Sequence, residues 1–161
     1  MEARAPIRGR LTKVRPATGD DVELLVRWHA DPEVARFWDG KTYTAEDMRR
    51  RLARPDVDAY VVEADERPIG YLQVWRDGEG GGGLDMFLAP EARGRKYGPD
   101  AARALAERLV REGWRRIIVD PYLWNERAIA AWERAGFERV EERPADDEHT
   151  APWLLMELRR F

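Results

Sequence analysis

The chain has 161 residues, 43% of them hydrophobic, which is enough for one compact domain with a core, and its net charge of −3 argues against a general nucleic-acid binder, a class that is usually basic. It contains no cysteine and no serine, which excludes disulfides, thiol nucleophiles, cysteine metal sites and a Ser-His-Asp triad. The two histidines, His29 and His149, are far apart in sequence and make a poor zinc site, and no apolar run reaches the roughly 18–20 residues of a membrane span.

The first part of the chain predicts one strand and three helices. Residues 1–9 are expected to be loose, and residues 10–16 form the first predicted strand. Two helices begin at capping boxes, in which a threonine caps the helix and an aspartate three positions later bonds back to it. These boxes are Thr18 with Asp21 and Thr44 with Asp47. Between them, Pro32 suits the first position of a short helix that ends at Asp39-Gly40.

The hydrophobic period then changes to that of strands. Residues 59–64 and 69–75 predict an antiparallel hairpin. Residues 77–83 include five glycines and are expected to form a loop with no element of their own. Residues 84–88 are the next predicted strand.

The last part of the chain alternates helices and strands. A helix is predicted from Pro99 to Glu112, and a strand over residues 116–119 follows it. Asn125 is a good N-cap for the last helix, which precedes two final strands over residues 138–143 and 153–159. We therefore expect a mixed α/β sheet with helices on both faces, in a single domain that spans residues 1–161.

A basic loop with two glycines joins the strand at 84–88 to the helix at Pro99. A helix start has unpaired backbone N–H groups and a positive dipole end, so this Arg93–Gly98 segment is a candidate phosphate site. Arg93, Arg95 and Lys96 add positive charge. A Walker-type ATP site is not supported, because the Gly-Lys-Ser/Thr ending is absent.

This loop, together with Asn125 and the later Ala-Gly-Phe segment, resembles the cofactor site of the GNAT superfamily of acyl-CoA-dependent N-acyltransferases. The family motif is Gln/Arg-x-x-Gly-x-Gly/Ala, and Arg93 and Gly98 match its ends. The resemblance implies a largely antiparallel sheet, acetyl-CoA as co-substrate, no metal, and an oxyanion donor at the Leu88 N–H. Lys96 replaces the usual middle glycine; because lysine rarely adopts positive φ, we expect the loop geometry to differ there. The cofactor contacts that the resemblance implies are Met86, Phe87, Leu88, Arg93, Gly94, Arg95, Lys96, Tyr97, Gly98, Pro99 and Asn125.

Within that superfamily the chain is most similar to the aminoglycoside 6′-N-acetyltransferases, from about residue 11 to residue 156. The similar stretches are Asp31–Gly40, Gly83–Asp85 and Asp120-Pro121. The resemblance implies that Asp85 is the catalytic base and also contacts the substrate, that Asp120 holds the cationic sugar rings, and that Trp38 lines the same cleft. As alternatives, Asp85 could cap a loop, Asp120 could be a turn residue, and Trp38 could be partly a packing residue.

Two features depart from those enzymes. The acidic, aromatic insertion that they often carry before Asp85 is replaced here by Glu79 and glycines. The tyrosine that many GNAT enzymes use as general acid falls on Trp132, whose indole N–H is not an acid, so Trp132 is interpreted as a packing residue.

The leading hypothesis is therefore an acetyl-CoA-dependent N-acetyltransferase acting on a small polycationic amine, foremost the 6′-amine of an aminoglycoside. The alternatives are an acyltransferase for a siderophore precursor or lysine-like amine, and a non-catalytic acyl-CoA-binding module. We expect a cytoplasmic monomer or homodimer with no nucleic-acid or membrane partner; the basic N-terminus lacks the apolar segment of a secretory signal.

Overall fold

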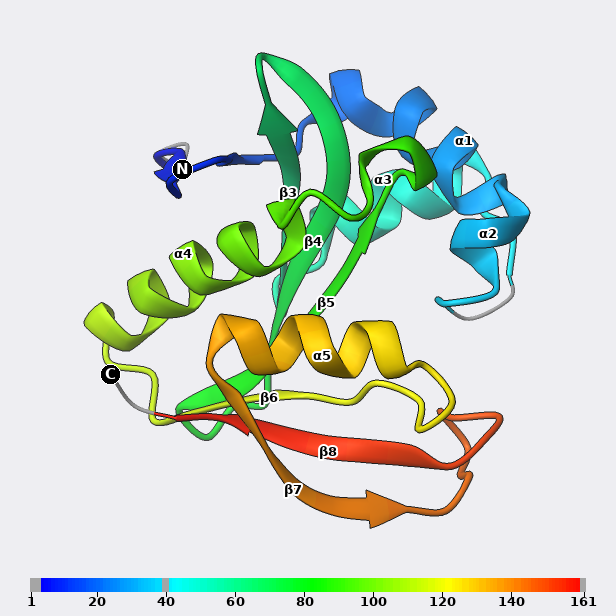
Figure 1. Ribbon diagram of the computed structural model, residues 1–161. Coiled ribbons are helices and arrows are strands. Elements are labelled where there is room, and N and C mark those ends of the chain that lie inside the picture. Colours follow the sequence, from blue (N-terminus) through cyan, green and yellow to red (C-terminus); the bar gives the residue numbers. More distant parts are fainter. Residues whose placement is uncertain (1–3, 39–40, 160–161) are drawn as a thin grey trace.

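The computed structural model describes residues 4–38 and 41–159, which fold around one eight-stranded sheet (Figure 1). The strands are β1 Ile7–Arg8, β2 Lys13–Pro16, β3 Val57–Ala64, β4 Arg67–Arg76, β5 Gly81–Leu88, β6 Arg116–Val119, β7 Phe137–Arg143 and β8 Trp153–Leu158. The helices are α1 Val22–Ala30, α2 Pro32–Ala35, α3 Ala45–Ala53, α4 Tyr97–Arg111 and α5 Glu126–Ala135. Single 3-10 turns lie at Gly19–Asp21 and Pro90–Ala92.

The sheet is antiparallel except at one place. Its strand order is β1-β2-β3-β4-β5-β6-β8-β7, and only the β5/β6 pair runs parallel. Helix α4 connects β5 to β6, as a parallel pair requires. The mixed, largely antiparallel α/β fold expected from the sequence is confirmed.

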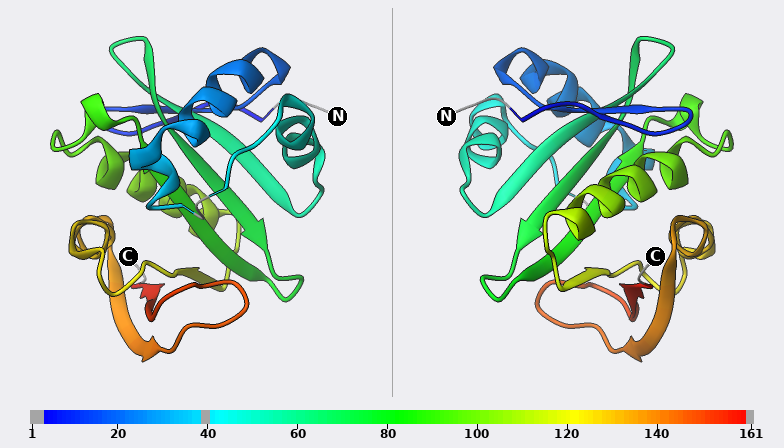
Figure 2. Two further views of the ribbon diagram at one scale, coloured as in Figure 1. Left: turned by 90° about the vertical axis from the view of Figure 1, so that its right-hand side faces the viewer. Right: turned by 90° about the vertical axis from the view of Figure 1, so that its left-hand side faces the viewer.

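Helices cover both faces of the sheet, as the alternation of side chains along the strands demands. One apolar cluster joins Leu72 and Leu84 of the sheet to Leu105 of α4 and Ile129 of α5. A second cluster on the opposite face includes Leu25 of α1 and Tyr71 and Phe87 of the sheet. The two turned views in Figure 2 show α1 and α2 in front of one face and α4 in front of the other.

Several helix starts agree with the sequence. Both predicted capping boxes are present, with reciprocal bonds between Thr18 and Asp21 and between Thr44 and Asp47. Helix α2 begins at Pro32 as predicted. Its expected end at Asp39-Gly40 lies outside the described residues.

Several sequence-based boundaries are wrong. Residues 7 and 8, expected to be loose, form strand β1, and the predicted strand over 10–16 begins only at Lys13 because the preceding residues turn back to pair with it. Helix α4 begins at Tyr97, two residues before Pro99.

A further error concerns the glycines before Leu84. Gly81 to Gly83 belong to strand β5 and pair with both neighbouring strands. A Cβ at Gly82 would overlap the Trp75 carbonyl oxygen, and one at Gly83 would overlap the Trp75 indole. Glycine is therefore needed here for close packing between two strands, not for a flexible loop.

Candidate active site

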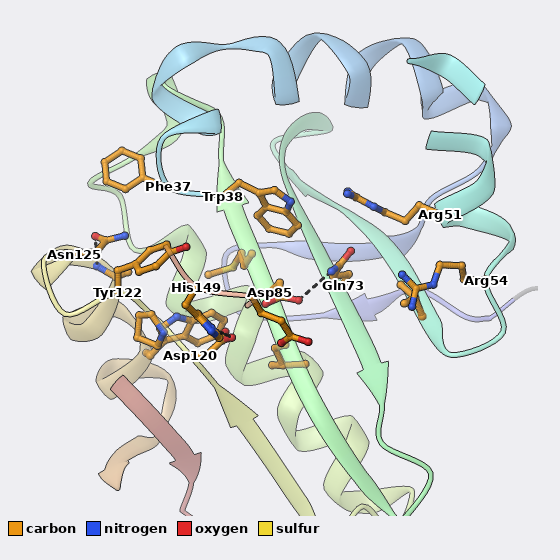
Figure 3. A pocket seen from close by; sticks show the side chains of 17 residues that line it. Phe37, Trp38, Arg51, Arg54, Gln73, Asp85, Asp120, Tyr122, Asn125 and His149 are labelled. Atoms are coloured by element: carbon orange, nitrogen blue, oxygen red, sulfur yellow. Dashed lines mark hydrogen bonds and ion pairs between the residues drawn. The ribbon is translucent and has the colours of Figure 1, made fainter. Parts of the chain in front are cut away.

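Strands β5 and β6 diverge after a short parallel contact. Their pairing runs from Gly81 with Arg116 to Gly83 with Ile118 and then stops. Asp85 and Asp120 each follow two residues after the last pair, so they lie level with each other on the two sides of the opening. Figure 3 shows both carboxylates among the side chains that line a pocket at this opening.

Beyond Gly83, none of the described strands pairs with β5 on the side that faces the opening. Ala89 donates its N–H to the Ile69 carbonyl at 2.8 Å, which fixes the alternation of hydrogen bonds between β5 and β4. By that alternation Phe87 bonds to β4, while Met86 and Leu88 direct their N–H and C=O groups toward the β6 side. Because β6 no longer pairs there, these groups are available to an extended ligand.

The loop after β5 places the N-terminus of α4 at the same opening. Gly94 and Lys96 have φ values of 81° and 67°, and α4 begins at the next residue. The expectation that a lysine would avoid positive φ at position 96 is wrong, since Lys96 adopts the left-handed conformation at a cost of about 1–2 kcal/mol. Among the described residues, no side chain caps α4 or α1, whereas α2, α3 and α5 are each capped by one. The first N–H groups of α4 can therefore bind an anion.

The three cations of the loop differ in their surroundings. The Arg93 guanidinium lies 3.6 Å from the Glu33 carboxylate, donates to the Glu33 carbonyl at 3.3 Å and covers the Phe37 ring. It therefore ties the loop to α2. Arg95 and Lys96 are exposed at the start of α4, where their charge can add to that of the helix end.

The pocket has a volume of about 340 Å³ and is lined by residues from five strands or helices and the loops beside them. Of the residues predicted for the substrate or the cofactor, it brings together Trp38, Asp85, Met86, Asp120 and Asn125. The others lie at the opening or beyond it: Phe87 is buried behind β5, and Leu88 to Pro99 form the end of β5, the loop and the start of α4. Gly98 is buried, and a Cβ on it would lie 3.2 Å from the Met86 methyl group.

Asp85 is held by a chain of neutral hydrogen bonds. The Gln73 amide donates to its Oδ2 at 2.9 Å (Figure 3). The Tyr71 hydroxyl donates to Gln73 Oε1 at 2.7 Å, which fixes the orientation of the amide. Burial raises the pKa of Tyr71 to about 12, so it remains a donor. Burial, together with the nearby charge of Asp120, raises the pKa of Asp85 to about 7, although Gln73, Arg51 and His149 act in the opposite direction.

Asp120 is paired with a histidine from the β7–β8 loop. His149 Nε2 lies 2.7 Å from Asp120 Oδ2, and its Nδ1 lies 2.8 Å from Asp146 Oδ1. Burial disfavours the charged ring, but the hydrogen bonds to Asp120 and Asp146 outweigh it and hold the pKa of His149 above its usual value. The ring stacks on Trp153 with a centroid distance of 4.2 Å.

The opposite wall of the pocket carries arginines of and beside α3 (Figure 3). Arg51 donates to His29 Nε2 at 2.9 Å, and its guanidinium lies 4.5 Å from the Tyr43 ring centroid. Since an arginine can only donate, His29 is the neutral tautomer whose Nδ1–H bonds to the Leu25 carbonyl. Trp38 packs edge-on against His29, which agrees with a role that is at least partly structural. Arg54 is paired instead with Asp56.

Two pocket residues come from α5. Asn125 Oδ1 accepts the Ala128 N–H at 3.1 Å and caps the helix as predicted. Trp132 is 7% exposed and packs edge-on against Phe137 at 5.3 Å, as expected of a packing residue, while one side of it reaches the pocket.

Comparison with known proteins decides the family. Residues 17–144 match the model of the acetyltransferase (GNAT) domain. The chain belongs to the GNAT acetyltransferases. It is therefore an N-acetyltransferase that uses acetyl-CoA, and the alternative of a non-catalytic acyl-CoA-binding module is set aside.

Relatives of this GNAT enzyme include aminoglycoside N(6′)-acetyltransferases type 1 from Klebsiella pneumoniae and Serratia marcescens, each 31% identical over 78% of this chain and 73% of the relative. The structure of AAC(6′)-Ib with paromomycin and acetyl-CoA is 28% identical, with a TM-score of 0.80 over 93% of this chain and 94% of that one. Spermidine N-acetyltransferase from Vibrio cholerae, with CoA and spermine, shares the fold at 12% identity and a TM-score of 0.80, over 92% of this chain and 95% of that one.

Sequence reasoning about this GNAT chain missed His149, Gln73 and Arg51. Gln73 carried a weak signal, because it lies on the predicted strand before the one that carries Asp85; the structure pairs the two residues. His149 follows an acidic loop and was considered only as a zinc ligand. Within residues 4–38 and 41–159, no three histidine or acidic side chains are grouped to hold a metal ion. None of the helices in that part of the chain combines the length and the apolar character needed to cross a membrane.

Proposed function

We propose that this GNAT enzyme acetylates a primary amine of a polycationic small molecule, foremost the 6′-amine of an aminoglycoside. The observation that carries the proposal is the pair of carboxylates, Asp85 and Asp120, at level positions beside the unpaired edge of β5. Ammonium groups need such carboxylates. The aminoglycoside acetyltransferases among the relatives support the same substrate class.

The residues around the opening fit acetyl-CoA, which supplies an acetyl thioester when bound. The uncapped start of α4, with Arg95 and Lys96 beside it, would hold the pyrophosphate. The free backbone groups of Met86 and Leu88 would bond to the pantetheine amides along β5. Asn125 lies on the far side of the same opening.

Asp85 is suited to remove a proton from the substrate ammonium. With a pKa of about 7 it is ionised in a large fraction of molecules at neutral pH, yet it is a stronger base than an ordinary carboxylate. The Leu88 N–H points toward the opening, where it would donate to the carbonyl oxygen as negative charge develops there. No general acid is needed, because a thiol pKa of about 8.5 makes the thiolate an adequate leaving group.

One observation favours a second candidate. Among the described residues, no acidic side chain lies within 4.0 Å of the Arg51 guanidinium, which lines the pocket opposite Asp120. An amine that also bears a carboxylate, such as a lysine-like amine or a siderophore precursor, would place its two charges against these two walls.

The deciding experiment measures acetyl-CoA turnover with kanamycin and with lysine at matched concentrations, using the Asp85→Asn variant as the blank. We expect kcat/KM to be at least about 100-fold higher for kanamycin, since multiple ammonium groups meet Asp85 and Asp120. The reverse preference, together with unchanged kanamycin susceptibility of cells that express the chain, would replace the first candidate by the second.

A further inference from the structure

His149 joins three parts of the molecule at the wall of the pocket. It belongs to the loop between β7 and β8, stacks on Trp153 of β8 and packs edge-on against Tyr122 of the β6–α5 loop. Only 7% of the residue is exposed. A buried histidine in contact with two carboxylates costs free energy unless its ring nitrogens are satisfied, and here both are.

Asp146 holds the β7–β8 loop in place and binds one of the two ring nitrogens of His149. Its carboxylate accepts the His149 and Glu148 backbone N–H groups at 2.8 and 3.0 Å and the Trp153 indole N–H at 3.1 Å. The hydrogen bond from the His149 ring lowers the pKa of Asp146, so this carboxylate is an acceptor only. The His149 Nδ1 must therefore carry a proton.

A proton must also lie between the second ring nitrogen and Asp120, and the raised pKa of His149, to which the hydrogen bonds from Asp120 and Asp146 contribute, assigns it to the ring. Nε2 and Asp120 Oδ2 are 2.7 Å apart, a distance at which two lone pairs would repel. With Nδ1 already protonated, a proton on Nε2 makes the ring an imidazolium between two carboxylates.

Within residues 4–38 and 41–159, no other cation forms an ion pair with Asp120 or Asp146. The charged groups that face the ring are Asp120 after β6, Asp146 of its own loop and Asp85 of β5, all acidic. Glu148 lines the pocket beside it. Arg143 of β7 lies 5.4 Å from the Trp153 ring, outside the pocket, and Arg51 stands on the opposite wall.

We propose that His149 is a positioning residue for the acetyl transfer: held as a cation between Asp146 and Asp120, it orients the Asp120 carboxylate toward the substrate amine and offsets its negative charge beside Asp85. Without such a counter-charge, the neighbouring carboxylates of Asp85 and Asp120 would tend to share one proton. Asp85 would then be protonated, and inactive as a base, over a wider range of pH. Together with Gln73 and Arg51, His149 keeps the base usable near neutrality.

The inference rests on the proposed function for the substrate, but its first test needs no substrate. The chain has only two histidines, so nitrogen-detected NMR of the tag-free protein gives two ring systems. We expect His149 to be doubly protonated, with a titration midpoint above the ordinary value of about 6.5, and His29 to be neutral with the proton on Nδ1. A neutral His149 ring at pH 6 would overturn the proposal.

The second test is the pH dependence of kcat/KM with kanamycin. His149→Gln keeps a donor to Asp120 without charge, and His149→Phe keeps only the ring that stacks on Trp153. The acid limb of the profile is the fall of kcat/KM at low pH as Asp85 becomes protonated. In both variants this limb should move to higher pH by about one unit. At a pH below the limb kcat/KM should therefore be about tenfold lower than in the native enzyme, and at high pH it should recover. KM for kanamycin should rise further in the Phe variant, because Asp120 also loses its donor.

Arg143→Gln is the matched control, since it removes a positive charge near the same loop but outside the pocket. Its acid limb should stay in place. A loss by the same factor at every pH in the His149 variants would indicate a merely structural role and refute the proposal. If kanamycin is not acetylated while His149 titrates as expected, the proposed substrate fails and the inference stands; if it is acetylated and the acid limb never moves, the inference fails alone.

Discussion

Replacing Asp85 by asparagine tests the proposed base most directly. An asparagine has nearly the same shape, and its Oδ1 can still accept the Gln73 amide that now bonds to the carboxylate at 2.9 Å. The substitution therefore removes the proton acceptor while keeping the hydrogen-bond chain from Tyr71. We expect kcat to fall by roughly 10²–10⁴, the usual contribution of a positioned base.

The pH dependence gives the magnitude a second check. With a pKa of about 7, Asp85 should be ionised in about half of the molecules at pH 7 and in about one tenth at pH 6. The native enzyme should therefore lose about tenfold in kcat/KM for each unit of pH below 7, beyond the change due to the amine itself. The variant should lack this limb.

The same carboxylate affects stability with a defined sign. Folding raises the pKa of Asp85 from 3.8 to about 7, so the folded chain binds more protons than the unfolded chain between these values, and its stability falls as the pH rises through them. Above pH 7 the ionised group costs about 4 kcal/mol. For a chain of this size, Asp85→Asn should thus raise the melting temperature by about 8–16 °C at pH 8, and by less at pH 5.

Stopped-flow or coupled assays of CoA release over pH 5.5–9, with melting curves at pH 5 and 8, measure both effects on one pair of proteins. A variant with native turnover at neutral pH would remove Asp85 from the mechanism. A variant that is inactive but no more stable at pH 8 would show that the carboxylate is not held in the costly ionised state described above.

Three further substitutions test other parts of the site. Asp120→Asn should raise KM for a polycationic amine about tenfold or more and leave acetyl-CoA affinity unchanged in calorimetric titration; a lost kcat at constant KM would instead make Asp120 catalytic. Gly98→Val should weaken acetyl-CoA binding by at least about tenfold, because a branched side chain would press on Met86 and shift β5; a folded variant with native affinity speaks against the cofactor site. Trp132→Phe should lower the free energy of unfolding by about 1–3 kcal/mol through lost packing yet keep kcat within a few-fold, and an inactive variant with an unchanged melting curve would reveal a direct role.

The helices could be predicted because their signals are local. Thr18, Thr44 and Asn125 cap the elements that follow them by bonds to residues two or three positions away, so the sequence alone contains both partners. The sequence is misleading about a glycine when the contact that requires it comes from a residue far away in the chain. Gly82 and Gly83 belong to a strand because Trp75 packs closely against them, and that contact depends on the pairing of β4 with β5.

The residues of the candidate site differ in the same way, because some could be predicted from the sequence and others could not. Asp85 and Asp120 could be chosen because Asp85 lies on a predicted strand, Asp120 directly follows one, and the resemblance pointed to both. His149 could not, since its two partners are fixed only when the β7–β8 loop folds back onto the end of β6. Lys96 shows the limit of propensity: the turn into α4 imposes positive φ, and the preference of one residue is outweighed.

The free edge of β5 has a consequence for how this enzyme can be studied. Its N–H and C=O groups belong to the main chain, and every amino acid except proline provides them equally. Truncating the side chains of residues 86–88 one at a time would therefore understate what this segment does. Replacing a single peptide bond by an ester, which deletes one donor and leaves the side chain intact, would reveal it. By the same reasoning, selection can change these side chains freely to suit new amines while the donor-binding surface persists.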